Sequence, residues 1–192
     1  MLDYHANMIV IGYQGSIIQA TGQCAEVIAF SDEVYVLENV PNVDDFITYD
    51  RPYSITTYLM VANNTIHVPF MINNLIPTFT MNNPGLIVNE IAKIHAEVSA
   101  KEHRYIYDAN LDVRISISFT DTFSYFKTSS LKNYEMENCH EYDVIYLSPN
   151  LESWNPTNPE WDDQEMEYIE RQGEVKPRPR DHLNNSTLSD PM

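Results

Sequence analysis

Asp3 is the residue whose type and position most directly suggest chemistry. It stands in Leu2-Asp3-Tyr4-His5-Ala6-Asn7, just before an apolar run at 8–11 and Gly12. A carboxylate becomes an acid-base catalyst when a second one shares its proton, because their proximity splits the two pKa values. One chain supplies one such residue, so the second carboxylate would come from another copy. The position is compatible with two Asp3 side chains that activate water for hydrolysis; the alternative, which is the commoner case for an Asp before an apolar strand, is a surface acid near a frayed N-terminus.

Other catalytic and metal-binding arrangements are not indicated. The His residues form no His-x-x-x-His pattern, and Cys24 and Cys139 lie far apart with no Cys-x-x-Cys pair, so no metal site is predicted. The sequence has no glycine-rich phosphate loop and no nucleophile elbow around a serine, so no cofactor is predicted either. Two distant cysteines are typical of reduced thiols, which indicates a cytoplasmic or nuclear protein.

The charge distribution excludes several classes of partner. The formal net charge is -17, and residues 1–50 and 135–170 contain acidic side chains but no Lys or Arg. Nucleic-acid binding depends on cations that displace counterions from phosphates, and anionic membranes repel acidic surfaces, so neither partner is expected for this chain alone. A basic protein or a cationic peptide fits the charge better. The apolar runs are also much shorter than the ~20 residues that a membrane-spanning helix needs.

Short apolar and β-branched runs separated by turn residues predict a mainly β domain. The strand candidates are 8–11, 26–30, 34–37, 43–49, 86–88, 113–119 and 144–147. Two further runs, at 55–62 and 65–70, are joined by Asn63-Asn64, residues that tolerate positive φ, and this pattern predicts a β-hairpin. Apolar residues alternate strictly along 113–119, which indicates one buried face.

The predicted organisation is a β domain over residues 1–127 followed by an acidic extension over 128–192. In the extension, Asn158-Pro159 and Gly173 predict one short helix near 160–172. The polar composition after residue 175 predicts disorder. We expect the chain from about residue 150 onward to pack weakly against the β core, because its uncompensated acidic residues repel one another.

The segment from Leu2 to Asn7 is the first of several stretches that follow one another in a fixed order. The others are Cys24 to Phe30 with Ser31 to Glu33, His67 to Pro69, Asn74 to Pro77, Gly85 to Asn89, Val113 to Ile117, Phe123 to Phe126, Trp154 to Pro156 and Gln164-Glu165. Together, over residues 2–170, they resemble the aspartic protease region of copia-like retrotransposon Pol polyproteins. The family has a catalytic Asp-Ser/Thr-Gly-Ala motif, which also occurs in an Asp-Ser-His-Ala-Asp form. The segment from Leu2 to Asn7 is similar to that second form.

The resemblance implies a retropepsin-like fold, which is a small closed β-barrel, here with the acidic extension attached. It implies that Asp3 is the catalytic residue of an aspartic-type endopeptidase and that a homodimer brings two Asp3 side chains together. The substrate would be a peptide or the polyprotein itself, with no cofactor. A flap-like hairpin at 55–70 would cover the substrate.

The chain also departs from the family pattern. Tyr4 stands where the family has Ser or Thr, whose small hydroxyl holds the two catalytic segments together across the dimer. His5 occupies the usual Gly position, as in one branch of the family, Asn7 replaces an acid, and the strand that normally precedes the Asp has no counterpart ahead of Met1. These differences predict impaired catalysis. They also support a second hypothesis, a catalytically inactive retroelement remnant that acts as an acidic, β-rich protein-interaction module.

Overall fold

The computed structural model describes residues 1–2, 8–27, 36–89, 104–120 and 123–149. All of these residues belong to one compact unit, Met1–Pro156. The unit is mainly β, with mixed and antiparallel sheets and a few short helices, as the sequence predicts.

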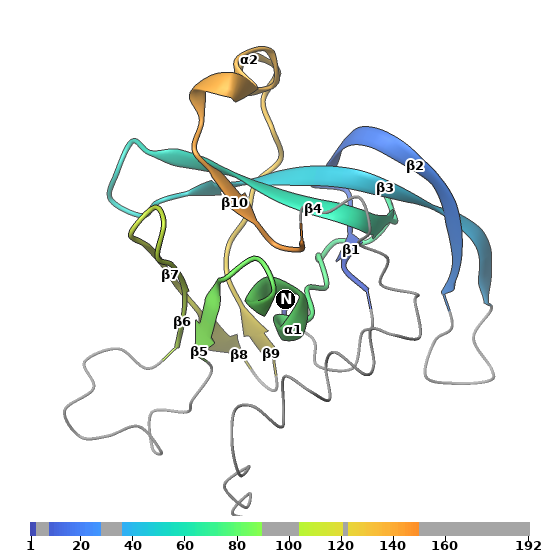
Figure 1. The fold of residues 1–192 in the computed structure, drawn as a ribbon, viewed down its shortest axis with the longest axis horizontal. Helices are drawn as coiled ribbons and strands as arrows, with labels where there is room; N and C mark the ends of the chain where they lie inside the picture. Colours follow the sequence, from blue (N-terminus) through green and yellow to red (C-terminus); the bar gives the residue numbers. More distant parts are fainter. Residues whose placement is uncertain (3–7, 28–35, 90–103, 121–122, 150–192) are drawn as a thin grey trace, which may run out of the picture. The chain divides into compact units, whose positions relative to one another are not determined.

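The largest sheet has five strands (Figure 1). They are β1 (Val10–Ile11), β2 (Ser16–Val27), β3 (Leu37–Asp50), β4 (Thr57–His67) and β10 (Val144–Tyr146). Strands β2, β3 and β4 form an antiparallel meander, and both β1 and β10 pair in parallel with β4. Because β3 occupies one edge of β4, strands β1 and β10 share the other edge.

Two small antiparallel sheets and two short helices complete the described fold. One sheet contains β5 (Ile87–Asn89), β6 (Tyr105–Asp108) and β7 (Val113–Ser116), and the other contains β8 (Ser118–Thr120) and β9 (Phe123–Tyr125). The helices are α1 (Thr78–Asn82) and α2 (Asn133–Glu137), and a 3-10 turn covers Cys139–Glu141. The main core joins these parts, since Ile47 and Met60 of the large sheet share one buried cluster with Met81 of α1 and Ile106 and Ile115 of the small sheet.

The hairpin predicted at 55–70 is wrong. Strand β4 runs through this region without a turn, between β3 on one edge and β1 and β10 on the other. Asn64 does adopt a positive φ of 50°, but it lies at a β-bulge, where the register between β3 and β4 shifts. Its N–H donates to Asp44 Oδ1 at 2.8 Å. The region expected to form a flap is therefore a largely buried central strand.

The closed barrel is not formed by the described strands. In the large sheet, strand β2 forms one edge, and strands β1 and β10, which both pair with β4, form the opposite edge. The two small sheets are separate three-stranded and two-stranded units. Within the described residues the sheets are therefore open.

The β core continues beyond residue 127, where the sequence predicts its end. Ser129 and Thr48 exchange two backbone hydrogen bonds of 2.9 Å, and β10 pairs with β4. Ile145 and Leu147 are fully buried in the main core. The core extends past residue 127 because the strand predicted at 144–147 forms as β10 and joins the large sheet. The helix predicted near 160–172 and the end of the chain lie outside the described residues.

Candidate functional site

Asp3 and the rest of segment 3–7 lie outside the described residues, so the site is built from the residues that flank it. On one side, Leu2 is buried in the main core, and its N–H donates to the Ser124 carbonyl at 2.8 Å. On the other side, Met8 is buried in a second apolar cluster. Both ends of the segment are therefore held in buried surroundings.

Residues 74–76 hold the chain on the upstream side of Asp3. The Ile76 N–H donates to the Met1 carbonyl at 2.9 Å. Leu2 forms a parallel β-bridge with Ile76. Because Ile76 belongs to the main core, this attachment is a fixed part of the fold.

The same three residues also hold the downstream side of the segment. Leu75 and Val10 exchange backbone hydrogen bonds of 2.8 and 2.9 Å. The Asn74 side chain accepts a hydrogen bond from the Gly12 N–H at 2.8 Å through Oδ1. Residues 74–76 therefore bind the described chain on both sides of segment 3–7, at residues 1–2 and at Val10 and Gly12.

The local sequence explains this arrangement. Pro77 follows the stretch with an extended backbone, at φ -63° and ψ 135°, and α1 begins after it. A proline also favours an extended residue before it, which keeps Ile76 in the bridge to Leu2. Gly12 is required at its position because a Cβ there would collide with the Met71 carbonyl oxygen.

A cavity of about 580 Å³ lies beside these attachments. Its lining residues are Met1, Gln14, Ile72, Asn73, Asn74, Ile76, Thr120, Phe123, Tyr125, Phe126, Lys127 and Thr128. Three of them, Met1, Asn74 and Ile76, also take part in holding segment 3–7. The volume is within the usual range of ligand sites, roughly 300–1,000 Å³. The structure therefore provides a space of binding size next to the ends of the segment that carries Asp3.

A buried Asp–His pair lies under the turn between β1 and β2. Asp45 on β3 is fully buried, and its Oδ2 lies 2.6 Å from Nδ1 of His67 at the end of β4. Burial raises the pKa of the Asp45 carboxyl above its ordinary value, and the hydrogen bond with His67 opposes this shift. A Cβ at Gly15 would lie 2.6 Å from Oδ2 and 2.7 Å from Oδ1, so only glycine leaves room for the carboxylate.

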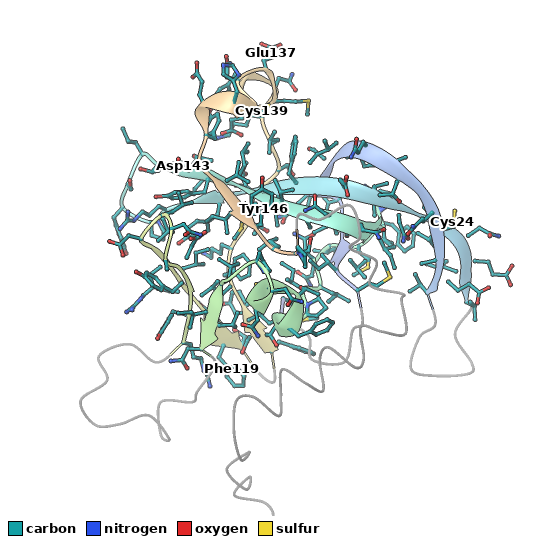
Figure 2. The ribbon with its side chains drawn as sticks, viewed as in Figure 1. Cys24, Phe119, Glu137, Cys139, Asp143 and Tyr146 are labelled. Atoms are coloured by element: carbon teal, nitrogen blue, oxygen red, sulfur yellow. The ribbon has the colours of Figure 1, made fainter. Side chains whose placement is uncertain are left out.

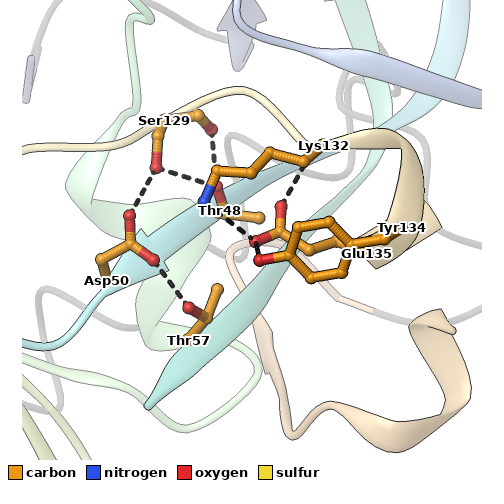
Figure 3. A network of polar contacts seen from close by, with 7 residues as sticks. All are labelled: Thr48, Asp50, Thr57, Ser129, Lys132, Tyr134 and Glu135. Atoms are coloured by element: carbon orange, nitrogen blue, oxygen red, sulfur yellow. Dashed lines mark hydrogen bonds and ion pairs between the residues drawn. The ribbon is translucent and has the colours of Figure 1, made fainter. Parts of the chain in front are cut away.

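A second polar network attaches the chain after β9 to the large sheet (Figure 3). Asp50 accepts hydrogen bonds from Thr57 Oγ1 at 2.7 Å and Ser129 Oγ at 3.0 Å. The hydrogen bond from Thr57 lowers the pKa of the Asp50 carboxyl. Glu135 accepts from the Lys132 backbone N–H at 2.8 Å and completes the capping box of α2. Both carboxylates are engaged by neighbouring donors, so the network has a structural role.

The structure offers no metal centre in the part of the chain that it describes, where no group of three or more His, Cys, Asp or Glu could hold an ion. Cys24 and Cys139 are both free and exposed, and Figure 2 shows them on separate parts of the fold. None of the described helices is long and apolar enough to cross a membrane.

The sequence pointed to Asp3 but not to the residues around it. Asn74 and His67 both stand in stretches that carry the family resemblance, but the sequence does not show their contacts. The role of Asn74 in holding Gly12 depends on a contact between residues 62 positions apart, and the Asp45–His67 pair joins different strands. A fully buried acid on a strand always needs a partner, but the sequence did not show that Asp45 is buried.

No protein-family model, curated protein or solved structure matches the chain.

Proposed function

We propose that the chain is a retroelement-derived, mainly β aspartic-protease-like domain that hydrolyses peptide bonds of a polyprotein in the cytoplasm or nucleus. Two copies form a homodimer, and each contributes Asp3 to a dyad that shares one proton. One carboxylate takes a proton from the attacking water, while the other donates a proton to the carbonyl oxygen of the scissile bond.

The double attachment of segment 3–7 to residues 74–76 is the observation that carries this proposal. A catalytic carboxylate must be held within about 0.5 Å of its productive position. The attachment of described residues on both sides of Asp3 to one stretch of chain, residues 74–76, is what supports the proposal. The neighbouring cavity supplies space for part of a peptide.

The exposed end of the β2–β3 pair is the proposed cover of the substrate, in place of the buried region at 55–70. Strands β2 and β3 form a long antiparallel pair. The side chains of β2 are exposed along most of its length, in contrast to those of β4. From Asn42 onward β3 pairs with β4 and is largely buried, but the part of β3 before Asn42 pairs with β2 alone and is mostly exposed. An exposed end of this kind can move over a bound peptide, whereas a central strand cannot leave its sheet.

The test is peptide cleavage by the full chain over a pH range from acidic to neutral, with Asp3→Asn as the control. We expect slow cleavage with an acidic to mildly acidic optimum, and none in the variant, because the dyad needs one proton shared by two carboxylates. Tyr4→Thr should raise kcat, since a small hydroxyl fits between the two segments and a phenol does not. A clean preparation of the wild-type and Tyr4→Thr chains that leaves a diverse peptide library uncut would overturn the proposal.

A second candidate function is an inactive interaction module, and the exposed strand β2 is the observation that favours it. Ile17 and Ile18 on β2 are 53% and 47% exposed, and the chain's net charge of -17 suits a basic partner. This candidate predicts a folded monomer that binds basic peptides and cuts none. A dimer with two Asp3 side chains in contact would contradict it.

A further inference from the structure

The cavity beside residues 74–76 has an apolar wall built from two separate parts of the chain. Its apolar side chains are Ile72, Ile76, Phe123, Tyr125 and Phe126. Ile76 and Phe126 are buried at 1% and 7% exposure, whereas Ile72 and Phe123 are 75% and 52% exposed. The cavity thus has a buried apolar floor and an apolar rim that solvent reaches, which suits a large apolar group that enters from solution.

A polar cluster forms another part of the lining. Thr128 Oγ1 donates to Gln14 Oε1 at 2.7 Å, and Asn74 Nδ2 lies 3.5 Å from the same oxygen. These contacts fix the orientation of the Gln14 amide, whose Nε2 has no hydrogen-bond partner among the described residues. An amide nitrogen that is oriented and unpaired can donate to a carbonyl group of a ligand.

Among the described residues that line the cavity, Lys127 has the one charged side chain. It makes no ion pair with any described residue, although acidic side chains outnumber basic ones by 28 to 11 in the chain. An unpaired cation, in a lining whose described residues include no carboxylate, favours an anionic group on the ligand. The repulsion from more distant acidic residues is screened beyond about 8 Å at physiological salt.

We propose that this cavity binds an extended peptide segment in which a large apolar residue stands beside an acidic one. The apolar side chain packs between Phe123 and the buried floor, the acidic side chain pairs with Lys127, and Gln14 Nε2 donates to a main-chain carbonyl. The ligand class rests on the proposed peptidase function, and the sequence preference follows from the cavity alone.

Binding by the full-length Asp3→Asn chain tests the preference without cleavage. Four labelled peptides, identical except at two adjacent positions, combine Phe or Ser with Asp or Lys, and fluorescence anisotropy measures their affinities. We expect the Phe-Asp peptide to bind most tightly. A Phe123→Ser substitution should weaken its binding by about tenfold or more, because one large apolar contact is lost. A Lys127→Glu substitution should reverse the preference from Asp to Lys.

Phe119→Ser is the matched control for Phe123→Ser. Phe119 lies in the same β8–β9 hairpin, is 50% exposed and does not line the cavity (Figure 2). Its substitution should leave the peptide affinities unchanged. Equal weakening by both Phe variants, an unaltered charge preference in Lys127→Glu, or no binding of any peptide would overturn the inference.

The outcomes also separate this inference from the proposed function. Selective binding of the Phe-Asp peptide, with no cleavage by the wild-type chain, would support the cavity's role and refute the peptidase. Cleavage of peptides with the same sequence preference in wild type and Phe123→Ser would support the peptidase and refute the cavity's role.

Discussion

Replacement of Asn74 by Ala should measurably loosen the attachment of segment 3–7. Asn74 is 4% exposed, and its Oδ1 is the acceptor for the buried Gly12 N–H at 2.8 Å. Loss of that acceptor leaves a buried donor unsatisfied, which costs about 1–3 kcal/mol. The contacts of Nδ2 with Gln14 and Thr128, at 3.5 and 3.4 Å, are long and add little. The backbone hydrogen bonds of residues 74–76 are unaffected by the substitution.

Thermal unfolding and amide hydrogen exchange measure this effect. For a chain of this size each kcal/mol lowers Tm by about 2–4 °C, so the expected decrease is about 2–12 °C. The Gly12 amide should exchange faster in Asn74→Ala than in the wild type, because its hydrogen bond is gone. If the chain cleaves peptides, kcat should fall together with Tm, since a displacement of 1 Å at a catalytic group costs about 100-fold in rate.

Asn73→Ala is the control for Asn74→Ala. Asn73 is exposed and lines the same cavity, but it makes none of the contacts that hold Gly12. Its substitution should change the free energy of unfolding by no more than about 0.5 kcal/mol. Equal Tm values for the two variants, or an unchanged exchange rate at Gly12, would refute the role assigned to Asn74.

Three further substitutions test the rest of the fold. Gly15→Ala should destabilise the chain by about 1–3 kcal/mol in urea denaturation, because the new Cβ would meet Ile11 and the Asp45 carboxylate; a neutral effect would contradict the packing of that turn. Burial raises the folded-state pKa of Asp45 above 3.8, the ordinary pKa of an Asp carboxyl. The stabilisation that the protonated carboxyl provides is therefore fully present below pH 3.8, and it is lost as the pH rises through the folded-state pKa. Asp45→Asn should therefore gain stability relative to wild type as pH rises through that window, and parallel urea-midpoint profiles would refute the shift. Ile145→Ala should cost about 2–5 kcal/mol, because Ile145 is fully buried on β10; a cost near zero would restore a domain boundary at residue 127.

The strands that could be predicted are those whose apolar runs are bounded by clear turn residues. The runs at 43–49, 86–88 and 144–147 correspond to β3, β5 and β10. The alternation at 113–119 holds for Val113, Ile115 and Ile117, which are buried. It fails at Phe119, which is half exposed, because the chain there has passed into the separate β8–β9 hairpin.

The failed hairpin at 55–70 shows the limit of local patterns. Positive φ at an Asn is needed both for a two-residue turn and for some β-bulges, so Asn63-Asn64 is compatible with either. The large sheet decides between them, because β3 pairs with β4 on both sides of the bulge, and β10 and β1 pair with the other edge of β4 before and after it. The contacts of Asn74 and the Asp45–His67 pair likewise depend on strand packing, which local periodicity does not reveal.

The most direct test of the central claim is a subunit-mixing experiment. Wild-type and Asp3→Asn chains are unfolded together, refolded at defined ratios and assayed for peptide cleavage at constant total protein. If each active site needs Asp3 from both copies of a symmetric dimer, activity follows the square of the wild-type fraction and falls to about a quarter in an equal mixture. A linear dependence, with about half of the activity in an equal mixture, would mean that each chain acts alone and would contradict a dyad shared between two copies.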